Sequence, residues 1–327
     1  MAIKRLIKRN YEEQQPTIYS AFMEFIEEKK AKNLASISIR DYEQSLHFFM
    51  NHFNYDDLTP IHYLTTEIFQ KWTSHMLETD LKPSSINRYL RDCRAFCNWC
   101  YNKENPYIYE PIKFQKVKGQ ESPLKAFKDE ELVAITKKPL DPNNFTEWRV
   151  WTVTQWILGT GNRCSTVVNV RIGDIDFRNK EIILRHTKNK KAQVIPLSST
   201  LEHIIKDYIK SWRYGCTSED YLFPNTANEK LTPEALTHSF SKYCKARGCS
   251  HTNIHGLRHS FALAWVRNGG NEFKLQKILG HSTLDMTRRY VNLATADLKE
   301  NYDSFTALSK LHKSKKPRNL MKEFRHV

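Results

Sequence analysis

Residues 174–198, DIDFRNKEIILRHTKNKKAQVIPLS, interrupt a chain whose apolar residues otherwise repeat at helical spacing. Two short β-rich runs in this stretch, residues 181–184 and 193–197, flank a polar, basic turn, which is typical of a β-hairpin. Helical patterns resume over residues 199–212 and 233–247. The stretch therefore predicts a short antiparallel sheet inserted in a helical domain, in a protein that is mainly α-helical.

A second helical region precedes this domain. Four apolar stripes at helical spacing lie between about residues 16 and 105. Their members are Ile18, Phe22, Phe25, Ile26, Ile39, Tyr42, Leu46, Phe49, Phe53, Ile68, Trp72, Met76, Ile86, Leu90, Cys93, Cys97 and Cys100. Three prolines and a glycine without a sustained period make residues 106–123 a predicted linker. The expected organisation is a basic segment 1–15, a helical domain 16–105, the linker, a second domain 124–304 and a basic tail 305–327.

The charge balance indicates a polyanionic partner. The 51 Lys and Arg residues exceed the 36 Asp and Glu residues, giving a net charge of +15, which favours nucleic acid or an anionic membrane surface. The longest apolar run, residues 151–159, contains Thr and Gln and is far shorter than the roughly 18 residues of a membrane span. Residues 1–15 lack the apolar stretch of about 7–15 residues found in a secretory signal. We therefore expect a cytoplasmic, nucleoid-associated protein with no membrane partner.

The seven cysteines raise the question of metal or disulfide chemistry. Cys93, Cys97 and Cys100 have the C-x3-C-x2-C spacing with which radical S-adenosylmethionine enzymes hold a [4Fe–4S] cluster. However, they continue an apolar helical stripe, and a free cysteine behaves as a small buried hydrophobe, so we interpret them as core residues. A zinc site would need a second ligand pair at finger spacing, which the remaining candidates lack. These candidates are Cys244, Cys249, His251 and His255. We expect no metal, no cofactor and no disulfide framework.

The second domain contains a more specific group of polar residues. In HGLRH, residues 255–259, a three-residue offset on an amphipathic helix puts His255 and Arg258 side by side, and imidazole beside guanidinium suits a phosphate. Further along, Gly280 supplies a helix stop before His281. Tyr290 follows nine residues after His281.

A new helix is predicted to begin directly after this stop. Ser282, with Asp285 three residues later, resembles a capping box. This pattern predicts that His281 is held at a rigid corner between two helices.

These motifs resemble the second conserved box of the tyrosine recombinases, the phage-integrase and Xer-type family. The sequence GTGNR, residues 159–163, resembles the first box, in which an active-site arginine opens a helix that runs into a three-stranded sheet. The basic turn at residues 188–191 resembles the hairpin that bears the family's lysine, and its spacing to Pro196 selects Lys188. The family usually has an acidic residue where this chain has Thr166. The likeness covers roughly residues 16–300 and implies a SAM-like helical core-binding domain followed by a mixed α/β catalytic domain.

The residue types suit strand cleavage at a phosphodiester. Arg163 and Arg258 offer fixed cations with fork geometry for the charge that grows on the non-bridging oxygens. Tyr290 is the predicted nucleophile and would form a 3′-phosphotyrosine, which a 5′ hydroxyl from another strand can reverse. The resemblance implies a Holliday junction intermediate.

Three further residues are predicted to assist the reaction, two of them by proton transfer. His255 is the predicted base for the tyrosine, because an imidazole titrates near neutrality. Lys188 is the predicted general acid for the departing 5′ oxygen. His281 is expected to hydrogen-bond the phosphate and to help hold the nucleophile.

Other residues are predicted to contact DNA directly. On the helix that begins near Ser84, a polar face made of Asn87, Arg88 and Arg91 is a candidate groove reader. Lys190 and Lys191 are candidate phosphate contacts.

The resemblance also implies an assembly. Four protomers would act on double-stranded DNA with inverted core sites and exchange C-terminal segments, docked by Phe305, Leu308 and Leu311. A disordered basic tail is the alternative. The favoured role is integration or excision of a mobile element, with an accessory directionality factor left open. The alternatives are an Xer-like dimer resolvase, a type IB topoisomerase and a DNA-binding protein without catalytic activity.

Overall fold

The computed structural model describes residues 15–104, 106–119, 124–185 and 192–294, and the chain divides into two compact units at residues 122 and 123. The described parts are mostly helical and include one three-stranded antiparallel sheet, which confirms the predicted fold class. Among these described parts, every helix is either too short or too polar to cross a bilayer.

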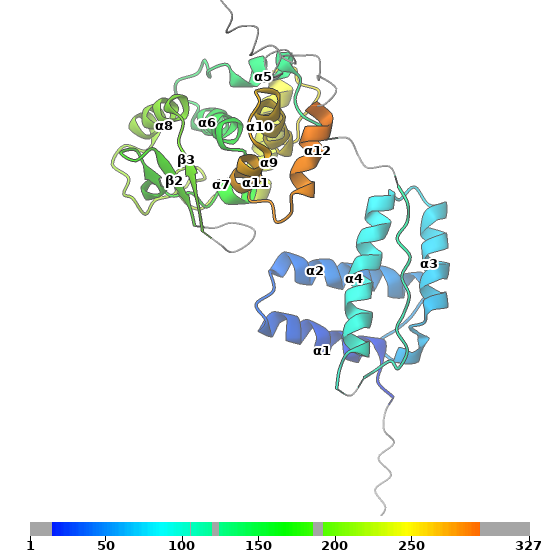
Figure 1. Ribbon diagram of the computed structural model, residues 1–327. Helices are drawn as coiled ribbons and strands as arrows, with labels where there is room; N and C mark the ends of the chain where they lie inside the picture. The colour runs from blue at the N-terminus through cyan, green and yellow to red at the C-terminus, as the bar shows by residue number, and fades with distance from the viewer. Residues whose placement is uncertain (1–14, 105, 120–123, 186–191, 295–327) are drawn as a thin grey trace, which may run out of the picture. The chain divides into compact units, whose positions relative to one another are not determined.

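The first unit is a group of helices assembled on α4 (Figure 1). Thr17 caps the first helix through a reciprocal hydrogen-bonded box with Ser20, and Thr65 caps the third. Pro83 occupies the first turn of the fourth, where its missing N–H costs nothing. The elements are α1 (Ile18–Ala31), α2 (Ser36–His52), η1 (Ile61–Tyr63), α3 (Thr66–Glu78) and α4 (Pro83–Tyr101).

Aromatic rings fill the centre of this unit. Trp72 is fully buried, with its ring centroid 5.1 Å from that of Phe49. The thiols of Cys93, Cys97 and Cys100 face the same core with exposures of 2% or less, and burial raises the pKa of Cys100 to about 12. The prediction that these cysteines act as apolar core residues is confirmed. In the ranges described, no three His, Cys, Asp or Glu side chains are grouped as metal ligands.

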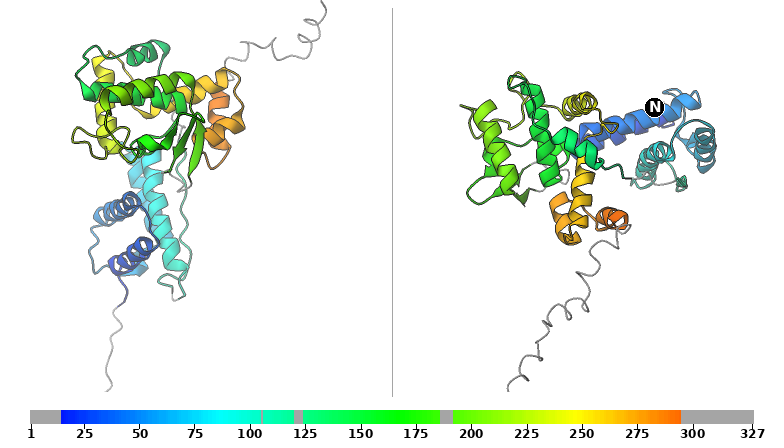
Figure 2. Two further views of the ribbon diagram at one scale, coloured as in Figure 1. Left: turned by 90° about the vertical axis from the view of Figure 1, so that its left-hand side faces the viewer. Right: turned by 90° about the horizontal axis from the view of Figure 1, so that it is seen from above.

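The second unit is arranged around α6. In Figure 1 and in the right-hand view of Figure 2, α6 lies between α8 and α10. Its Val153 and Trp156 are fully buried, so the apolar run noted in the sequence belongs to a central helix. The helices are α5 (Asp129–Thr136), α6 (Phe145–Thr160), α7 (Cys164–Val167), η2 (Ile172–Asp174), α8 (Ser199–Trp212), α9 (Pro233–Ala246), α10 (His255–Arg267), α11 (Glu272–Leu279) and α12 (Asp285–Ala294).

The sheet contains β1 (Ile175–Asp176), β2 (Glu181–Leu184) and β3 (Gln193–Pro196) in the order β1-β2-β3. Ile182 pairs with Ile195, and both are buried in the core of the second unit. Val194, on the opposite face, is 56% exposed. This alternation confirms the predicted hairpin, and the pairing of β1 with β2 completes the three-stranded sheet.

The position of Trp72 generates a stability prediction. We expect Trp72→Ala to lower the free energy of unfolding of the first unit by about 3–5 kcal/mol, because it removes a fully buried ring and leaves a cavity. Urea unfolding followed by far-UV circular dichroism measures the change. Leu58→Ala is the control: Leu58 is 78% exposed, so its loss should alter stability by at most about 0.5 kcal/mol. Equal effects of the two substitutions would contradict this description of the core.

Candidate active site

Two arginines meet at the carboxyl end of α11. Arg258 on α10 donates from Nη1 to the Gly161 carbonyl at 2.7 Å and from Nη2 to the Leu279 carbonyl at 2.8 Å. Arg163, the N-cap of α7, lies with Nη1 3.4 Å from the same Leu279 carbonyl. The ends of α6 and α11 therefore hold both guanidinium groups in one place.

Glycine at position 161 allows the ends of α6 and α11 to lie close together. Gly161 ends α6 in the left-handed region at φ 66°, and a Cβ there would lie 2.5 Å from Phe261 Cδ1 and 2.6 Å from Leu279 Cδ2. Gly280 ends α11 in the same region at φ 61°, as the sequence predicted. Each turn exposes a helix-terminal carbonyl that an arginine can bind.

The arginine pair is a concentrated positive charge. Arg258 is 4% exposed, and its burial together with the nearby Arg163 lowers the pKa of Arg258 to about 10, so it stays charged at neutral pH. Burial also lowers the pKa of Arg163. Thr166 is buried and donates its backbone N–H to the Arg163 carbonyl at 2.9 Å. A buried and a half-buried cation, both held by neutral carbonyls, suit an anionic ligand.

Tyr290 on α12 lies beside two histidines. It is 4% exposed, and its hydroxyl lies 2.9 Å from Nδ1 of His259 on α10. The ring of His281 is nearly parallel to the tyrosine ring at 6.3 Å, and its Nδ1 lies 2.9 Å from the Thr287 hydroxyl. Burial raises the pKa of Tyr290, whereas the charges of Arg258 and the other nearby arginines act in the opposite direction.

The structure gives the tyrosine a different histidine neighbour from the one predicted. His255, the predicted base, is exposed at the first residue of α10, with its ring centroid 6.1 Å from that of His259. The hydrogen bond to the tyrosine hydroxyl is made by His259, one helical turn further along. Sequence reasoning missed His259, although its position four residues after His255 places both on one helix face.

The half-buried imidazoles of His259 and His281 are neutral at pH 7. Burial, together with the nearby His255, Arg258 and Arg289, lowers the pKa of His259 to about 4. Burial and the two active-site arginines likewise lower the pKa of His281 to about 4. Each ring therefore keeps a lone pair that can accept a proton.

The corner between α11 and α12 differs from the prediction. Asp285 is the first residue of α12 and not its third, so the predicted capping box is wrong. The Ser282 hydroxyl lies instead 3.9 Å from the sulfur of Met286. The residue between the two helices, His281, is held by Thr287 as described above.

Several predicted residues lie outside the described part of the chain. They are Lys188, Lys190, Lys191, Phe305, Leu308 and Leu311. The strand after the three lysines is anchored close to the site, because the side-chain amide of Gln193 donates to the carbonyls of Lys277 and Ile278, the latter at 3.1 Å. This contact joins the hairpin to the carboxyl end of α11.

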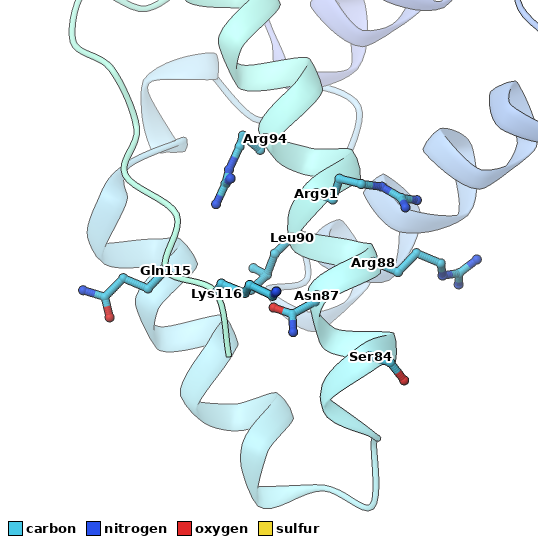
Figure 3. A pocket seen from close by; sticks show the side chains of 8 residues that line it. All are labelled: Ser84, Asn87, Arg88, Leu90, Arg91, Arg94, Gln115 and Lys116. Carbon is cyan, nitrogen blue, oxygen red and sulfur yellow. The ribbon is translucent and has the colours of Figure 1, made fainter. Parts of the chain in front are cut away.

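The predicted groove readers on α4 line a pocket of about 340 Å³ with Ser84, Leu90, Arg94, Gln115 and Lys116 (Figure 3). Arg88 pairs with Asp41 at 3.2 Å, and Arg91 reaches Asp92 at 2.9 Å while 68% of its side chain remains exposed. Thus the guanidinium groups of both arginines have acidic partners in this structure.

Asn87 has a role that the sequence did not predict. Its side-chain amide donates to the Val117 carbonyl and accepts from the Val117 N–H, both at 2.9 Å. Asn87 therefore pairs with the segment that follows the helical domain, and it would reach a base only after releasing that segment.

Comparison with known proteins places these features in a family. The Phage integrase family model matches residues 124–297, and the model of the phage integrase N-terminal SAM-like domain matches residues 21–104. The chain is 22% identical over 294 residues to the tyrosine recombinase XerD of Staphylococcus epidermidis, covering 88% of this chain and 98% of that protein. XerD of Staphylococcus aureus is also 22% identical, over 293 residues, with the same coverage.

Solved structures share the fold. The Tn1549 transposon integrase in complex with transposon right end DNA has a TM-score of 0.68 and 21% identity, covering 87% of this chain and 99% of that one. XerH in a post-cleavage complex with a palindromic difH substrate has a TM-score of 0.65 and 21% identity, covering 84% of this chain and 82% of that one. Since the catalytic family model alone covers more than half of the sequence, this chain belongs to the phage integrase family and is a tyrosine-type site-specific recombinase.

Proposed function

We propose that this recombinase cleaves DNA by attack of Tyr290 on a phosphodiester, and rejoins strands through the resulting 3′-phosphotyrosine. The observation that carries the proposal is the convergence of Arg163 and Arg258 on the Leu279 carbonyl. Tyr290 lies near enough to both arginines that their charges act to lower its pKa. Because an arginine has five N–H donors and Arg258 uses two of them on carbonyls, donors remain for a phosphate.

The chemistry follows from charge and proton transfer. In-line attack forms the bond from the tyrosine oxygen to phosphorus and breaks the bond from phosphorus to the 5′ oxygen. The arginine pair stabilises the negative charge on the non-bridging oxygens. His281 is proposed to hydrogen-bond the phosphate, and Lys188 to protonate the 5′ oxygen as it departs. Rejoining runs the same steps in reverse with a 5′ hydroxyl from the exchanged strand.

DNA is the proposed substrate because the net charge is +15 and solved structures of the same fold hold DNA. Arg88 and Arg91 are proposed to exchange their acidic partners for the duplex. Four protomers on two inverted core sites would pass through a Holliday junction, exchanging their C-terminal segments. Lys190 and Lys191 are proposed phosphate contacts.

For the biological role, we propose integration or excision of a mobile element, supported by the fold shared with a transposon integrase. An accessory directionality factor would be a further partner. The second candidate is resolution of chromosome or plasmid dimers, favoured by the match to nearly the full length of XerD. The sequence of the DNA that flanks the gene distinguishes them, since the ends of a mobile element contain the inverted core sites. A strand-exchange assay separates both from a type IB topoisomerase, which only relaxes supercoils.

The nucleophile is tested by Tyr290→Phe. We expect this variant to bind DNA but to form no covalent adduct, because only the attacking oxygen is lost. The substrate is a nicked duplex carrying the site that the protein selects from random-sequence DNA, and denaturing gels detect the adduct. Tyr243→Phe is the matched control, since it also removes a buried hydroxyl from the second unit, and it should retain adduct formation. An adduct formed by the Tyr290 variant would refute the assignment.

The general acid is tested by Lys188→Ala. If Lys188 protonates the 5′ oxygen, replacing that oxygen with sulfur should restore most of the lost cleavage, because a thiolate leaves without a proton. Lys190→Ala and Lys191→Ala should instead reduce the salt dependence of binding by about one unit of slope each. If the sulfur substrate rescued the variant of Lys190 or Lys191 but not that of Lys188, the general acid would be assigned to the rescued lysine.

The arginine geometry is tested by Gly161→Ala. The new Cβ would collide with Phe261 and Leu279 and displace the carbonyl that holds Arg258. We expect adduct formation to slow by about 100-fold, the cost of misplacing a catalytic group by about 1 Å, with DNA affinity retained. Gly215→Ala is the control, because Gly215 also has a positive φ, 77°, but no atom within 4 Å of its Cβ position. Equal rates for the two variants would contradict the proposed constraint.

A further inference from the structure

Side chains from other elements of the second unit bind the last carbonyls of α11. The side-chain amide of Gln193 on β3 donates to the carbonyls of Lys277 and Ile278, the latter at 3.1 Å. The next carbonyl along the helix, that of Leu279, accepts from the two active-site arginines at 2.8 and 3.4 Å. The last carbonyls of an α-helix point beyond its end and take their partners from elsewhere. A donor that holds two of these three consecutive carbonyls therefore also sets the direction of the third.

The sheet holds the backbone of Gln193 in place. Gln193 pairs with Leu184 of β2, which is 2% exposed in the core of the second unit. Because side chains alternate along a strand, Gln193 lies on the same face of β3 as the buried Ile195. Its half-buried side chain reaches α11 from this face, and its amide oxygen lies 3.3 Å from the position of a Cβ on Gly280. The amide is thus fixed between the sheet and the end of the helix.

We propose that Gln193 is a positioning residue, which holds the end of α11 so that the Leu279 carbonyl faces both active-site arginines. This inference rests on the proposed function and adds to it a residue that supports the arginines without touching the phosphodiester. Glutamine suits this role because its NH2 group has two hydrogens, one for each carbonyl. Its amide is also neutral, so it adds no charge beside the arginines.

Arg163 depends on this contact more than Arg258 does. Arg258 also donates to the Gly161 carbonyl at 2.7 Å, so it keeps an anchor on α6 if the end of α11 moves. Arg163 lies 3.4 Å from the Leu279 carbonyl, beyond the usual range of about 2.7–3.2 Å for an N–H···O bond. A small displacement of that carbonyl would therefore separate the two groups, and loss of the Gln193 amide should misplace Arg163 first.

Apolar contacts hold α11 in the fold independently of Gln193. Leu275 is fully buried and Leu279 is 2% exposed, and both belong to the apolar cluster that includes Tyr290. These side chains keep the helix against α10 and α12, whereas hydrogen bonds set the direction of its last carbonyls. We therefore expect a variant without the amide to fold but to lose the alignment of the site.

The test compares the full-length protein with Gln193→Met on the nicked duplex used for Tyr290. Methionine has a similar length but no N–H donor. We expect adduct formation to slow by about 10- to 100-fold with DNA affinity retained, the upper figure being the cost of misplacing a catalytic group by about 1 Å. Gln155→Met is the matched control, because Gln155 on α6 also donates its side-chain amide to a carbonyl, that of Thr136 at 3.2 Å. The control should keep the wild-type rate, and equal rates for the two variants would overturn the proposal.

A double-mutant cycle with Arg163→Ala separates positioning from an independent effect. If Gln193 acts by holding Arg163 in place, Gln193→Met should slow the reaction little further once the guanidinium is gone, because the effects of residues that act as a unit do not add. The same fold-change as in the wild-type background would overturn the proposal. Arg163→Lys, which also removes the guanidinium, supplies the cycle if the alanine variant reacts too slowly to measure.

The leaving-group analogue separates this route from one through the general acid. Lys188, the proposed acid, precedes β3 in the sequence, so a change at Gln193 could act on the leaving group instead. With sulfur in place of the 5′ oxygen, the defect of Gln193→Met should persist, because the arginines act on the non-bridging oxygens. Restoration of the rate would assign the effect to the leaving group and overturn the proposal.

Two further measurements keep the result of the test unambiguous. Thermal unfolding verifies that the variant is folded, and Gln193→Glu, which has nearly the same size but no N–H donor, replaces it if it is not. If the wild type itself gives no adduct through Tyr290, the proposed function fails. If the wild type reacts and only the Gln193 results disagree, this inference alone fails.

Discussion

The buried guanidinium of Arg258 is the constraint on which the site depends. A buried charge that loses its partners is costly, so the Gly161 and Leu279 carbonyls must both stay within reach of Arg258. These two carbonyls end α6 and α11, while the arginine belongs to α10. One side chain therefore fixes three helices relative to one another. Arg163, which shares the Leu279 carbonyl, is positioned by the same arrangement.

This constraint explains why the chain needs glycine where the two helices end. A left-handed residue turns the backbone so that the last carbonyls face away from the helix, and Gly161 and Gly280 adopt that conformation. At Gly161 the tight approach of Phe261 and Leu279 leaves no space for a side chain. Backbone conformation at the helix ends, and not only the choice of arginine, therefore sets the shape of the cationic site.

Periodicity alone predicted most of the fold. The helix predicted at residues 199–212 is α8, and the predicted hairpin is β2 and β3, because alternation and helical spacing follow directly from which face is buried. The site was harder to predict. Residues four apart share a helix face, so spacing could not show which of His255 and His259 lies nearer to Tyr290. The packing of α12 on α10 brings His259 within hydrogen-bond distance of the tyrosine. The pairing of Asn87, a predicted groove reader, with Val117 could not be predicted, because the two residues lie 30 positions apart in the sequence.

The two arginines dominate the electrostatics of the site. Arg258, which is buried, and Arg163, which is half-buried, repel further positive charge. Burial together with this repulsion keeps His259 and His281 neutral, and the repulsion raises the cost of leaving the cations without an anion. A phosphate placed between the arginines would relieve that repulsion. In the proposed reaction, the substrate would therefore bring the charge that the site lacks.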